Sequence, residues 1–205
     1  MAQQKEKTTI CEAAIIGLAY NADQTQVAFS PNNHVVIIAD CTAAPNDCMK
    51  WKILHELEQH GQAVTAIHWH SKTNKILSVA QDRTGLVWTF DKAANEWKCA
   101  MLMLEAAMKR GLTACAWSCD GDRAYVGSAA CNIATGMWDE ENAWWWCKAF
   151  KDLHGSTVTS VAAHPTRNRM LATGSTDCRV SIIDAAVKPV DGCAPSVLRD
   201  VFFRA

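Results

Sequence analysis

Short apolar runs separated by polar turns recur along the chain, and this pattern predicts β-strands. It is clearest where Val64–Trp69, Ile76–Ala80 and Leu86–Trp88 are separated by turns at residues 71–75 and 81–85. Short consecutive runs joined by tight turns favour antiparallel strands. The runs lack a strict polar–apolar alternation, which indicates strands that are buried on both faces.

The same unit recurs with a period near 48 residues. Its register residues lie at intervals of 49, 48 and 46: Tyr20, Trp69, Trp117 and Ala163. A turn position follows thirteen residues later in three copies and fourteen later in the last: Asn33, Asp82, Ala130 and Asp177. A fixed period of this size indicates stacked copies of one small unit. The spacing resembles that of WD repeats, in which each copy forms one four-stranded propeller blade.

We therefore expect an all-β chain, a WD-repeat β-propeller with about four blades present, that is, a partial propeller. Met101–Met108 has strong helical propensity, but the repeat places an outer strand at Met101–Leu104, and tertiary context can override propensity. The other outer strands are expected near Trp51–Leu57 and Trp144–Phe150. The expected division is a polar N-terminal tail at 1–9, a propeller over 10–191 with blades at about 10–57, 58–104, 105–150 and 151–191, and an unassigned tail at 192–205.

Composition narrows the class of protein further. The net charge of -1 and pI near 6.6 give no electrostatic reason to expect nucleic acid or an anionic membrane as partner. The longest apolar run, Ala13–Tyr20, is far shorter than the roughly 18 residues of a membrane span, and residues 1–7 lack the apolar core of a secretion signal. We expect a soluble intracellular chain. None of its ten cysteines forms Cys-x-x-Cys, and they are interpreted as small buried hydrophobes, with a disulfide framework as the alternative.

One constellation in the second copy could be catalytic. His60, Ser78 and Asp82 are expected to come together with Trp88, and Ser, His and Asp in proximity suggest nucleophilic hydrolysis. The favoured interpretation is a structural chain of hydrogen bonds that runs from the carboxylate through the imidazole and the hydroxyl to the indole. Such a chain gives each buried polar group a partner.

The fourth copy repeats three members of this network at His154, Thr173 and Asp177. Each histidine stands four residues before the leading valine of its copy, Val64 or Val158. One active site does not occur twice in register, whereas a scaffold bond does. Ser78 also lacks a Gly-x-Ser-x-Gly elbow. No catalytic residue is expected.

Two further features could bind a ligand. His68 and His70 flank Trp69 on one face of a strand, a geometry that can hold a metal, but a third ligand is not evident. No metal and no cofactor are expected, since Walker-type and dinucleotide glycine patterns are absent. The second feature is Trp144–Trp146, which either inserts between blades or forms a partner hot spot. Side chains alternate along a strand, so Trp145 faces opposite Trp144 and Trp146.

Several segments resemble one particular family, the WD-repeat (p40/p41) subunit of the actin-related protein 2/3 complex, in its N-terminal part only. The likeness runs from about Ile10 to Asp191. Its most specific segments are Pro31-Asn-Asn-His34, within Thr25–His34, and Trp144-Trp145. Other matching segments are His55–His60, Asp82-Arg83 with Val87-Trp88, Val126–Ser128, Glu141-Asn142, Ser156–Val158 and Lys188–Asp191.

The resemblance implies a non-enzymatic seven-bladed propeller that docks on other subunits of that complex and helps to nucleate branched actin filaments. It implies a cytoplasmic, cytoskeletal location, with the actin filament contacted indirectly. The alternative is a generic WD-repeat adaptor that binds a peptide or partner protein across the propeller face. A third candidate is a hydrolase built from His60, Ser78 and Asp82.

The chain departs from the family in four respects. It supplies only four blades, it has no counterpart of the family's late helical insertion, Ala130 stands at the turn position of aspartate, and Gly155 stands where the family tends to carry a basic residue. Unclosed propellers expose apolar blade faces and strand edges. We therefore expect a partial product that is marginally stable or prone to aggregate alone, which a monomeric, cooperatively melting protein would contradict.

Overall fold

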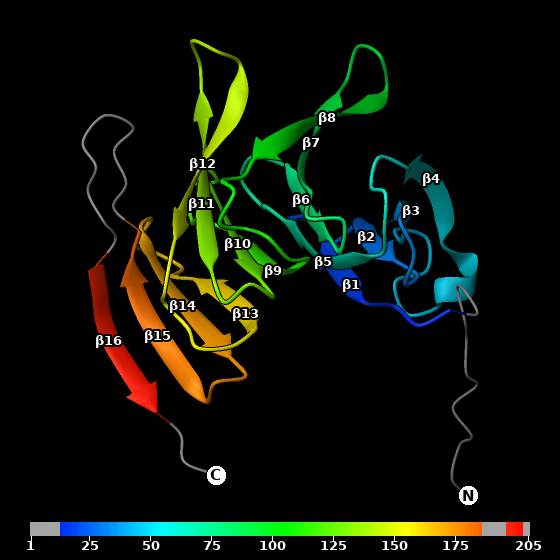
Figure 1. Cartoon of the computed structure of the whole chain (residues 1–205). Coiled ribbons are helices and arrows are strands. Elements are labelled where there is room, and N and C mark those ends of the chain that lie inside the picture. The colour runs from blue at the N-terminus through cyan, green and yellow to red at the C-terminus, as the bar shows by residue number, and fades with distance from the viewer. Residues whose placement is uncertain (1–12, 186–195, 203–205) are drawn as a thin grey trace, which may run out of the picture.

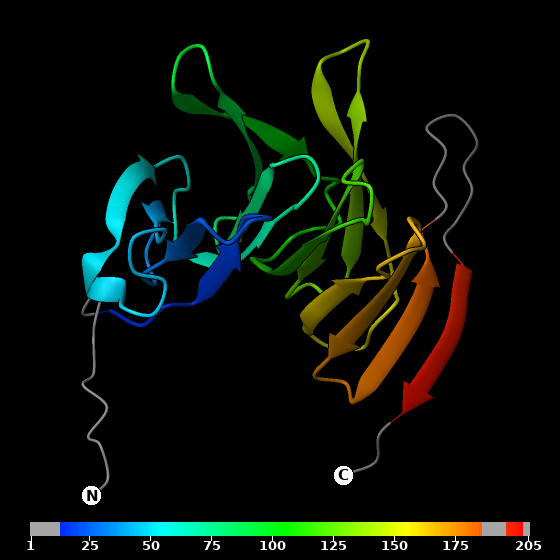
Figure 2. The ribbon, with the colours of Figure 1, turned by 180° about the vertical axis from the view of Figure 1, so that it is seen from behind.

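The chain folds into four four-stranded blades arranged side by side in an open arc (Figures 1 and 2). The computed structural model describes residues 13–185 and the strand backbone of residues 196–202. The expected tail at 1–9, Cys11, the Lys188–Asp191 segment and Cys193 lie outside the described residues. Within the described part, the expectation of WD-type all-β blades is confirmed.

Each blade runs outward from an inner strand through antiparallel neighbours. Blade 1 comprises β1 (Gly17–Tyr20), β2 (Gln26–Ser30), β3 (Val36–Asp40) and β4 (Lys52–Leu57), with the short 3-10 helix η1 (Cys48–Lys50) before β4. Blade 2 comprises β5 (Val64–Trp69), β6 (Ile76–Ala80), β7 (Gly85–Asp91) and β8 (Glu96–Met103). Blade 3 comprises β9 (Leu112–Trp117), β10 (Arg123–Ser128), β11 (Ile133–Asp139) and β12 (Trp144–Phe150). Blade 4 comprises β13 (Val158–Ala163), β14 (Met170–Ser175), β15 (Arg179–Asp184) and β16 (Ser196–Phe202).

Two outer strands are informative. The first residues of the helix-prone segment, Met101–Met103, form the end of β8, which pairs with β7 from Asp91 opposite Glu96 to Leu86 opposite Met101. Residues 104–108 form neither helix nor strand. The outer strand of blade 4, β16, comes from the 192–205 segment that the sequence analysis left unassigned. It completes blade 4 by pairing antiparallel with β15.

The strands are buried on both faces because neighbouring blades pack against each other. All five residues of β6 are buried. One apolar cluster lies between blades 1 and 2, a second between blades 2 and 3, and a third between blades 3 and 4. On the far side of blade 1, Trp51 and Ile37 pack on a small cluster that includes Val27 and Phe29. The core is thus divided into layers between blades.

The inner strands carry a repeated device between blades. A β-bulge interrupts the pairing of β5, β9 and β13 near their first residues. The bulge residues Thr65 and Thr113 donate their hydroxyls across to the next blade, to the carbonyls of Leu112 (2.8 Å) and Val158 (2.5 Å). In blade 4, Thr159 donates to Gly174 within its own blade. The bulges of blades 2 and 3 therefore each place a hydroxyl where it bonds to the blade that follows.

Blades 2 and 3 are also joined at their outer strands. β8 and β12 pair in parallel through Leu102 with Trp145 and Met103 with Trp146, which merges the two blades into one eight-stranded sheet. Leu102 points into the interior between Gly85 and Gly136, where a Cβ would come within 2.7 and 3.3 Å of its side chain. Glycine at these two positions thus makes room for Leu102. We call this β8–β12 contact the outer seam.

Candidate functional site

His60, Ser78 and Trp88 form a buried hydrogen-bonded chain inside blade 2. His60 lies in the loop before β5, Ser78 at the centre of β6 and Trp88 on β7. The Ser78 hydroxyl lies 2.7 Å from Nε2 of His60 and accepts the indole N–H of Trp88 at 2.8 Å. All three side chains are almost completely buried. The hydroxyl therefore satisfies two groups that burial would otherwise leave unpaired.

Asp82 joins this chain through a residue that the sequence analysis did not include, Thr84. The carboxylate lies 3.7 Å from Nδ1 of His60, beyond hydrogen-bonding distance. Instead, the Thr84 hydroxyl donates to Asp82 at 2.5 Å and lies 2.8 Å from the same Nδ1 atom. The expected direct bond from carboxylate to imidazole is therefore wrong for blade 2. The other carboxylate oxygen accepts the backbone N–H of Gly61 at 2.6 Å, which ties the incoming loop to the turn.

The signal for Thr84 is present in the sequence. A hydroxyl residue two positions after an aspartate commonly bonds back to that carboxylate, and the Thr84 backbone N–H also donates to Asp82 at 2.8 Å. The turn residue between them, Arg83, has a positive φ of 70°. The left-handed residue lets the chain turn tightly enough for both bonds to reach one carboxylate.

The electrostatics of the network favour a neutral histidine beside an ionised aspartate. Desolvation lowers the pKa of His60 below its ordinary value, although nearby Asp82 opposes the shift. Burial alone would raise the pKa of Asp82, but hydrogen bonds from Thr84 and Gly61 outweigh it and hold the pKa below the ordinary value. Both groups are thus held in the protonation states that the network needs near neutral pH.

Blade 4 contains the same arrangement without the tryptophan. His154 lies 2.9 Å from the Thr173 hydroxyl through Nε2 and 3.1 Å from Asp177 through Nδ1. Here the carboxylate reaches the imidazole directly, because Arg179 stands at the place of Thr84. Asp177 again accepts the following backbone N–H, from Gly155, at 2.7 Å. Hydrogen bonds from Gly155 and Arg179 outweigh the effect of burial and lower the pKa of Asp177.

This geometry serves structure better than catalysis. The Ser78 side chain is fully buried, so a substrate carbonyl cannot approach its oxygen. That oxygen also accepts the Trp88 N–H, which lowers its value as a nucleophile. The arrangement recurs in two blades at the same register. The network closes the loop, the second strand and the turn of a blade on one another.

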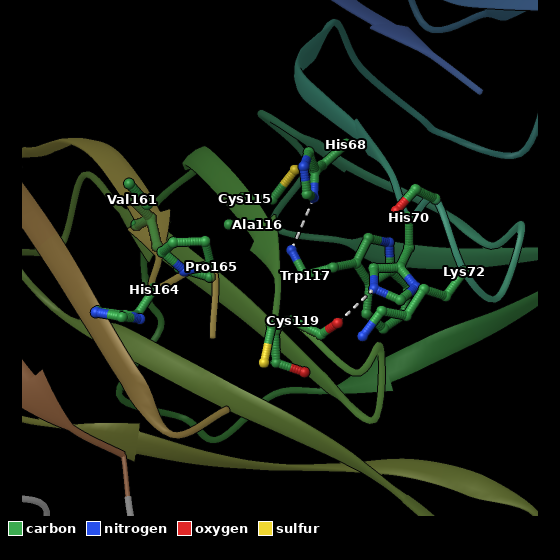
Figure 3. A pocket seen from close by; sticks show the side chains of 14 residues that line it. His68, His70, Lys72, Cys115, Ala116, Trp117, Cys119, Val161, His164 and Pro165 are labelled. Carbon is green, nitrogen blue, oxygen red and sulfur yellow. Dashed lines mark hydrogen bonds between the residues drawn. The ribbon is translucent and has the colours of Figure 1, made fainter. Parts of the chain in front are cut away.

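His68 and His70 line a cavity of about 460 Å³ between the inner strands of blades 2, 3 and 4 (Figure 3). Nδ1 of His68 accepts the backbone N–H of Trp117 at 2.8 Å. His70 accepts the Thr73 N–H at Nδ1, and its Nε2 lies 3.4 Å from the Cys119 carbonyl. Desolvation lowers the pKa of both histidines. The pair bridges blades, and no group of three potential metal ligands occurs among the described residues.

The three consecutive tryptophans divide between the two faces of β12. Trp145 is 2% exposed and packs edge-on against Trp117 and Trp138, with ring centroids 5.5 and 5.8 Å apart. Trp144 is 43% exposed and Trp146 is half-buried. Trp146 lies opposite Met103 across the outer seam. Trp145 therefore belongs to the core between blades 2 and 3, Trp146 packs in part against the cluster between blades 3 and 4, and Trp144 is the most exposed of the three.

The cysteines fit their expected role only in part. Eight are free in the described residues, and Cys41 and Cys147 are buried. Burial raises the pKa of the Cys147 thiol to about 12, so it stays protonated at neutral pH. Cys99 and Cys178 are exposed, because they lie on an outer strand and on a turn, respectively.

Comparison with known proteins agrees with the repeat structure. The WD domain, G-beta repeat family matches residues 51–89 and 146–184. These two matches span the hydrogen-bonded core of blade 2 and that of blade 4. The chain therefore contains WD repeats and has a propeller-blade fold. No helix within the described part is long and apolar enough to cross a membrane.

The similarity extends to one particular kind of WD-repeat protein. Actin-related protein 2/3 complex subunit 1A of Arabidopsis thaliana is 36% identical over 173 residues, which are 84% of this chain and 43% of that protein. Subunit 1A-B of Xenopus laevis is also 36% identical, over 84% of this chain and 44% of its own length. Subunit 1 of Schizosaccharomyces pombe is 30% identical over the same shares. These matches confirm the resemblance, and the chain spans less than half the length of these curated relatives.

Proposed function

We propose that this chain acts as a non-catalytic scaffold subunit of an actin-related protein 2/3 complex and contributes to the nucleation of branched actin filaments. The observation that carries the proposal is its 36% identity, over 84% of its length, to proteins named as subunit 1 of that complex. The proposed partners are the other subunits, with the actin filament contacted indirectly. The proposed location is the cytoplasm, in actin-rich structures of the cytoskeleton.

A scaffold acts through its surface, and one patch has the composition of a binding hot spot. Leu102 on β8 and Trp145 on β12 are paired and point inward. Because side chains alternate along a strand, the residues on either side of them lie on the outward side of the outer seam: Met101, Met103, Trp144 and Trp146. We call these four residues the seam patch. Met101, Met103 and Trp144 are 52%, 48% and 43% exposed. Aromatic residues and methionine are enriched at the centres of protein interfaces.

The test is an affinity pull-down from the cytosol of the native source. The tagged full chain is expected to recover an actin-related protein and other subunits of the complex. The double variant Trp144→Ala/Met103→Ala should lose most of that recovery, since large hot-spot side chains each contribute about 2 kcal/mol or more. Met49→Ala is a matched control, because Met49 is apolar, 62% exposed and located on blade 1.

Three outcomes decide between the candidates. Recovery of the complex that depends on the seam patch supports the proposal in full. Recovery that is insensitive to the patch leaves the subunit role standing and removes the patch from it. Failure to recover any actin-related protein, together with binding of short peptides, would instead favour a WD-repeat adaptor that uses the cavity between the inner strands.

A further inference from the structure

A second cavity opens between blades 2 and 3 on the side of the β11–β12 hairpin. It has a volume of about 450 Å³. The turn before β6, the turn before β10 and the hairpin all contribute to its wall. We call it the hairpin cavity, and its defining residues are Lys75, Asp120, Asp122, Trp138, Glu140 and Trp145. None of these residues belongs to the buried network or to the seam patch. Trp145 alone also packs in the core.

One wall of the hairpin cavity is aromatic and already holds a cation. Lys75 places its Nζ atom 5.4 Å from the ring centroid of Trp145, which is a cation–π contact. Trp138 stacks edge-on against Trp145 but is itself 43% exposed. The cavity thus contains one indole that is engaged by an ammonium group and a second indole that remains accessible.

The polar wall is acidic. Three carboxylates line the hairpin cavity against the single ammonium group of Lys75. Asp120 faces Lys72 at 3.4 Å, and Asp122 lies 3.7 Å from Nε of Arg123. Lys72 and Asp120 are both more than half exposed, and an exposed ion pair is weak, whereas the Arg123 side chain is only 14% exposed and offsets part of the charge of Asp122. Glu140 has no cationic side chain within 4 Å among the described residues and is exposed. The cavity therefore attracts positive charge.

We propose that the hairpin cavity binds the guanidinium group of an arginine carried by an extended segment of a partner protein. The planar guanidinium would stack on Trp138 and pair with Glu140. Arginine fits better than lysine, because a guanidinium stacks on aromatic rings and is weakly hydrated. This inference deepens the docking role and rests on the proposal that the chain acts through protein contacts. It does not depend on which complex the chain joins.

The test follows the indole N–H signals of the full chain by two-dimensional ¹H–¹⁵N NMR. The chain has nine tryptophans, and a Trp138→Phe variant identifies the relevant signal. Addition of the capped peptide Ala-Arg-Ala should shift the Trp138 signal in a saturable way, and Ala-Lys-Ala should do so more weakly. The same peptide with citrulline, which keeps the shape of arginine but is neutral, should not. The shift should require higher peptide concentration as ionic strength rises.

Variants of the cavity residues should change the affinity for the arginine peptide in predictable directions. Glu140→Gln and Trp138→Ala should each weaken binding of the arginine peptide by about threefold or more. Because the Trp138 signal is missing in Trp138→Ala, binding to that variant is measured from the Trp145 indole signal. Lys75→Met should strengthen binding by about twofold, because it removes a repelling charge. An anion site would respond to Lys75→Met in the opposite direction.

Trp144→Ala is the matched control. Trp144 has the same 43% exposure on the same hairpin but does not line the cavity, so its loss should leave peptide binding unchanged. Equal binding of the citrulline peptide, or equal loss in the Trp138 and Trp144 variants, would overturn the inference. If the peptide fails to bind while the pull-down still recovers the complex, the cavity inference fails and the proposed function stands.

Discussion

Blades 2 and 3 place different chemistry at the same positions. Counted from the first residue of the inner strand, Val64 or Leu112, the three core members of the blade 2 network meet apolar counterparts in blade 3. The pairs are His60 with Met108, Ser78 with Val126, and Trp88 with Gly136. Met108 and Val126 are as buried as the polar residues they replace. The fold therefore accepts either three polar side chains that hydrogen-bond to one another or three apolar residues at these buried positions.

The two solutions are each complete. In blade 2, the hydroxyl, the imidazole and the indole pair with one another. In blade 3, no polar side chain is left at these positions, and the outer seam delivers Leu102 of blade 2 against Gly136. Replacement of both partners of a buried hydrogen bond by apolar groups can be nearly neutral, whereas removal of one partner is costly. A blade that combines polar and apolar residues at these three positions should therefore be less stable than blade 2 or blade 3 as it stands.

The largest expected effect comes from mixing the two solutions. Ser78→Val places the blade 3 residue into blade 2 and leaves the His60 imidazole and the Trp88 indole buried without their shared partner. We expect a loss of about 3 kcal/mol in the free energy of unfolding, since each unsatisfied buried group costs roughly 1–3 kcal/mol. Urea denaturation measures this loss.

The reciprocal change is its control. Val126→Ser buries a hydroxyl among apolar groups in blade 3 and should cost about 1–3 kcal/mol. If the free energy of unfolding of both variants stays within about 0.5 kcal/mol of that of the parent chain, the polar and apolar sets are interchangeable residue by residue. The contrast drawn between blades 2 and 3 would then be wrong.

Acid should weaken blade 2 more than blade 3. The pKa of His60 is lowered in the folded chain, so its contribution to stability is present above its ordinary value near 6.5 and is lost as the pH falls below it. The lowered pKa of Asp82 adds a second loss, which begins only below its ordinary value of 3.8. Between pH 7 and pH 5, a single histidine can contribute a slope of up to about 1.4 kcal/mol per pH unit.

His68 and His70 also have lowered pKa values, so the whole chain loses stability toward acid. The double variant His60→Met/Ser78→Val removes the contribution of blade 2 and keeps those two histidines. Unfolding measured at several pH values should show a shallower decline in this variant. Identical slopes would exclude His60 as a source of the acid sensitivity.

The bulge hydroxyls should contribute a smaller amount between blades. Thr65→Val removes the bond to the Leu112 carbonyl of blade 3 and should cost about 1 kcal/mol. Thr159→Val removes only an exposed bond within blade 4 and should cost less than half as much. Thermal unfolding of the two variants tests the difference, and equal losses would mean that the contact between blades adds nothing.

The smallest effect is expected from restoring the aspartate that blade 3 lacks. In blade 3, Lys109 stands where Gly61 stands in blade 2, but its backbone N–H already donates to Ala107 at 3.0 Å. Ala130→Asp would therefore find neither a histidine nor the loop N–H that Asp82 accepts from Gly61, and we expect a change within about 0.5 kcal/mol. A gain above 1 kcal/mol in urea denaturation would show that the turn alone can use a carboxylate.

The repeat period was enough to predict the blades, apart from the outer strand of blade 4, and the contact of His60, Ser78 and Trp88 inside blade 2. Trp69 and Trp117 end inner strands as expected, and Ser78 lies between His60 and Trp88. Periodicity succeeds here because each blade must bury the same positions against its neighbours. The strand predicted at Met101–Leu104 is present as the end of β8, which runs to Met103, for the same reason.

Other features depend on contacts that no local pattern contains. Thr84 could have been found from its spacing to Asp82, but its position between carboxylate and imidazole depends on the depth of the turn. The parallel pairing of Leu102 with Trp145 joins two outer strands that the repeat keeps separate. The division of Trp145 from Trp144 follows from alternation, whereas the choice of the buried side depends on Leu102 and Trp117.

The threonine bulges give a direction to two junctions of the arc, that between blades 2 and 3 and that between blades 3 and 4. The earlier blade supplies the hydroxyl donor and the later blade supplies the carbonyl acceptor. The order of the blades along the chain therefore fixes which side of the contact donates. A duplicated copy of blade 3 would carry both halves of this contact, the Leu112 carbonyl that accepts and the Thr113 hydroxyl that donates. Growth of such a protein by gene duplication can therefore proceed one blade at a time without new complementary surfaces.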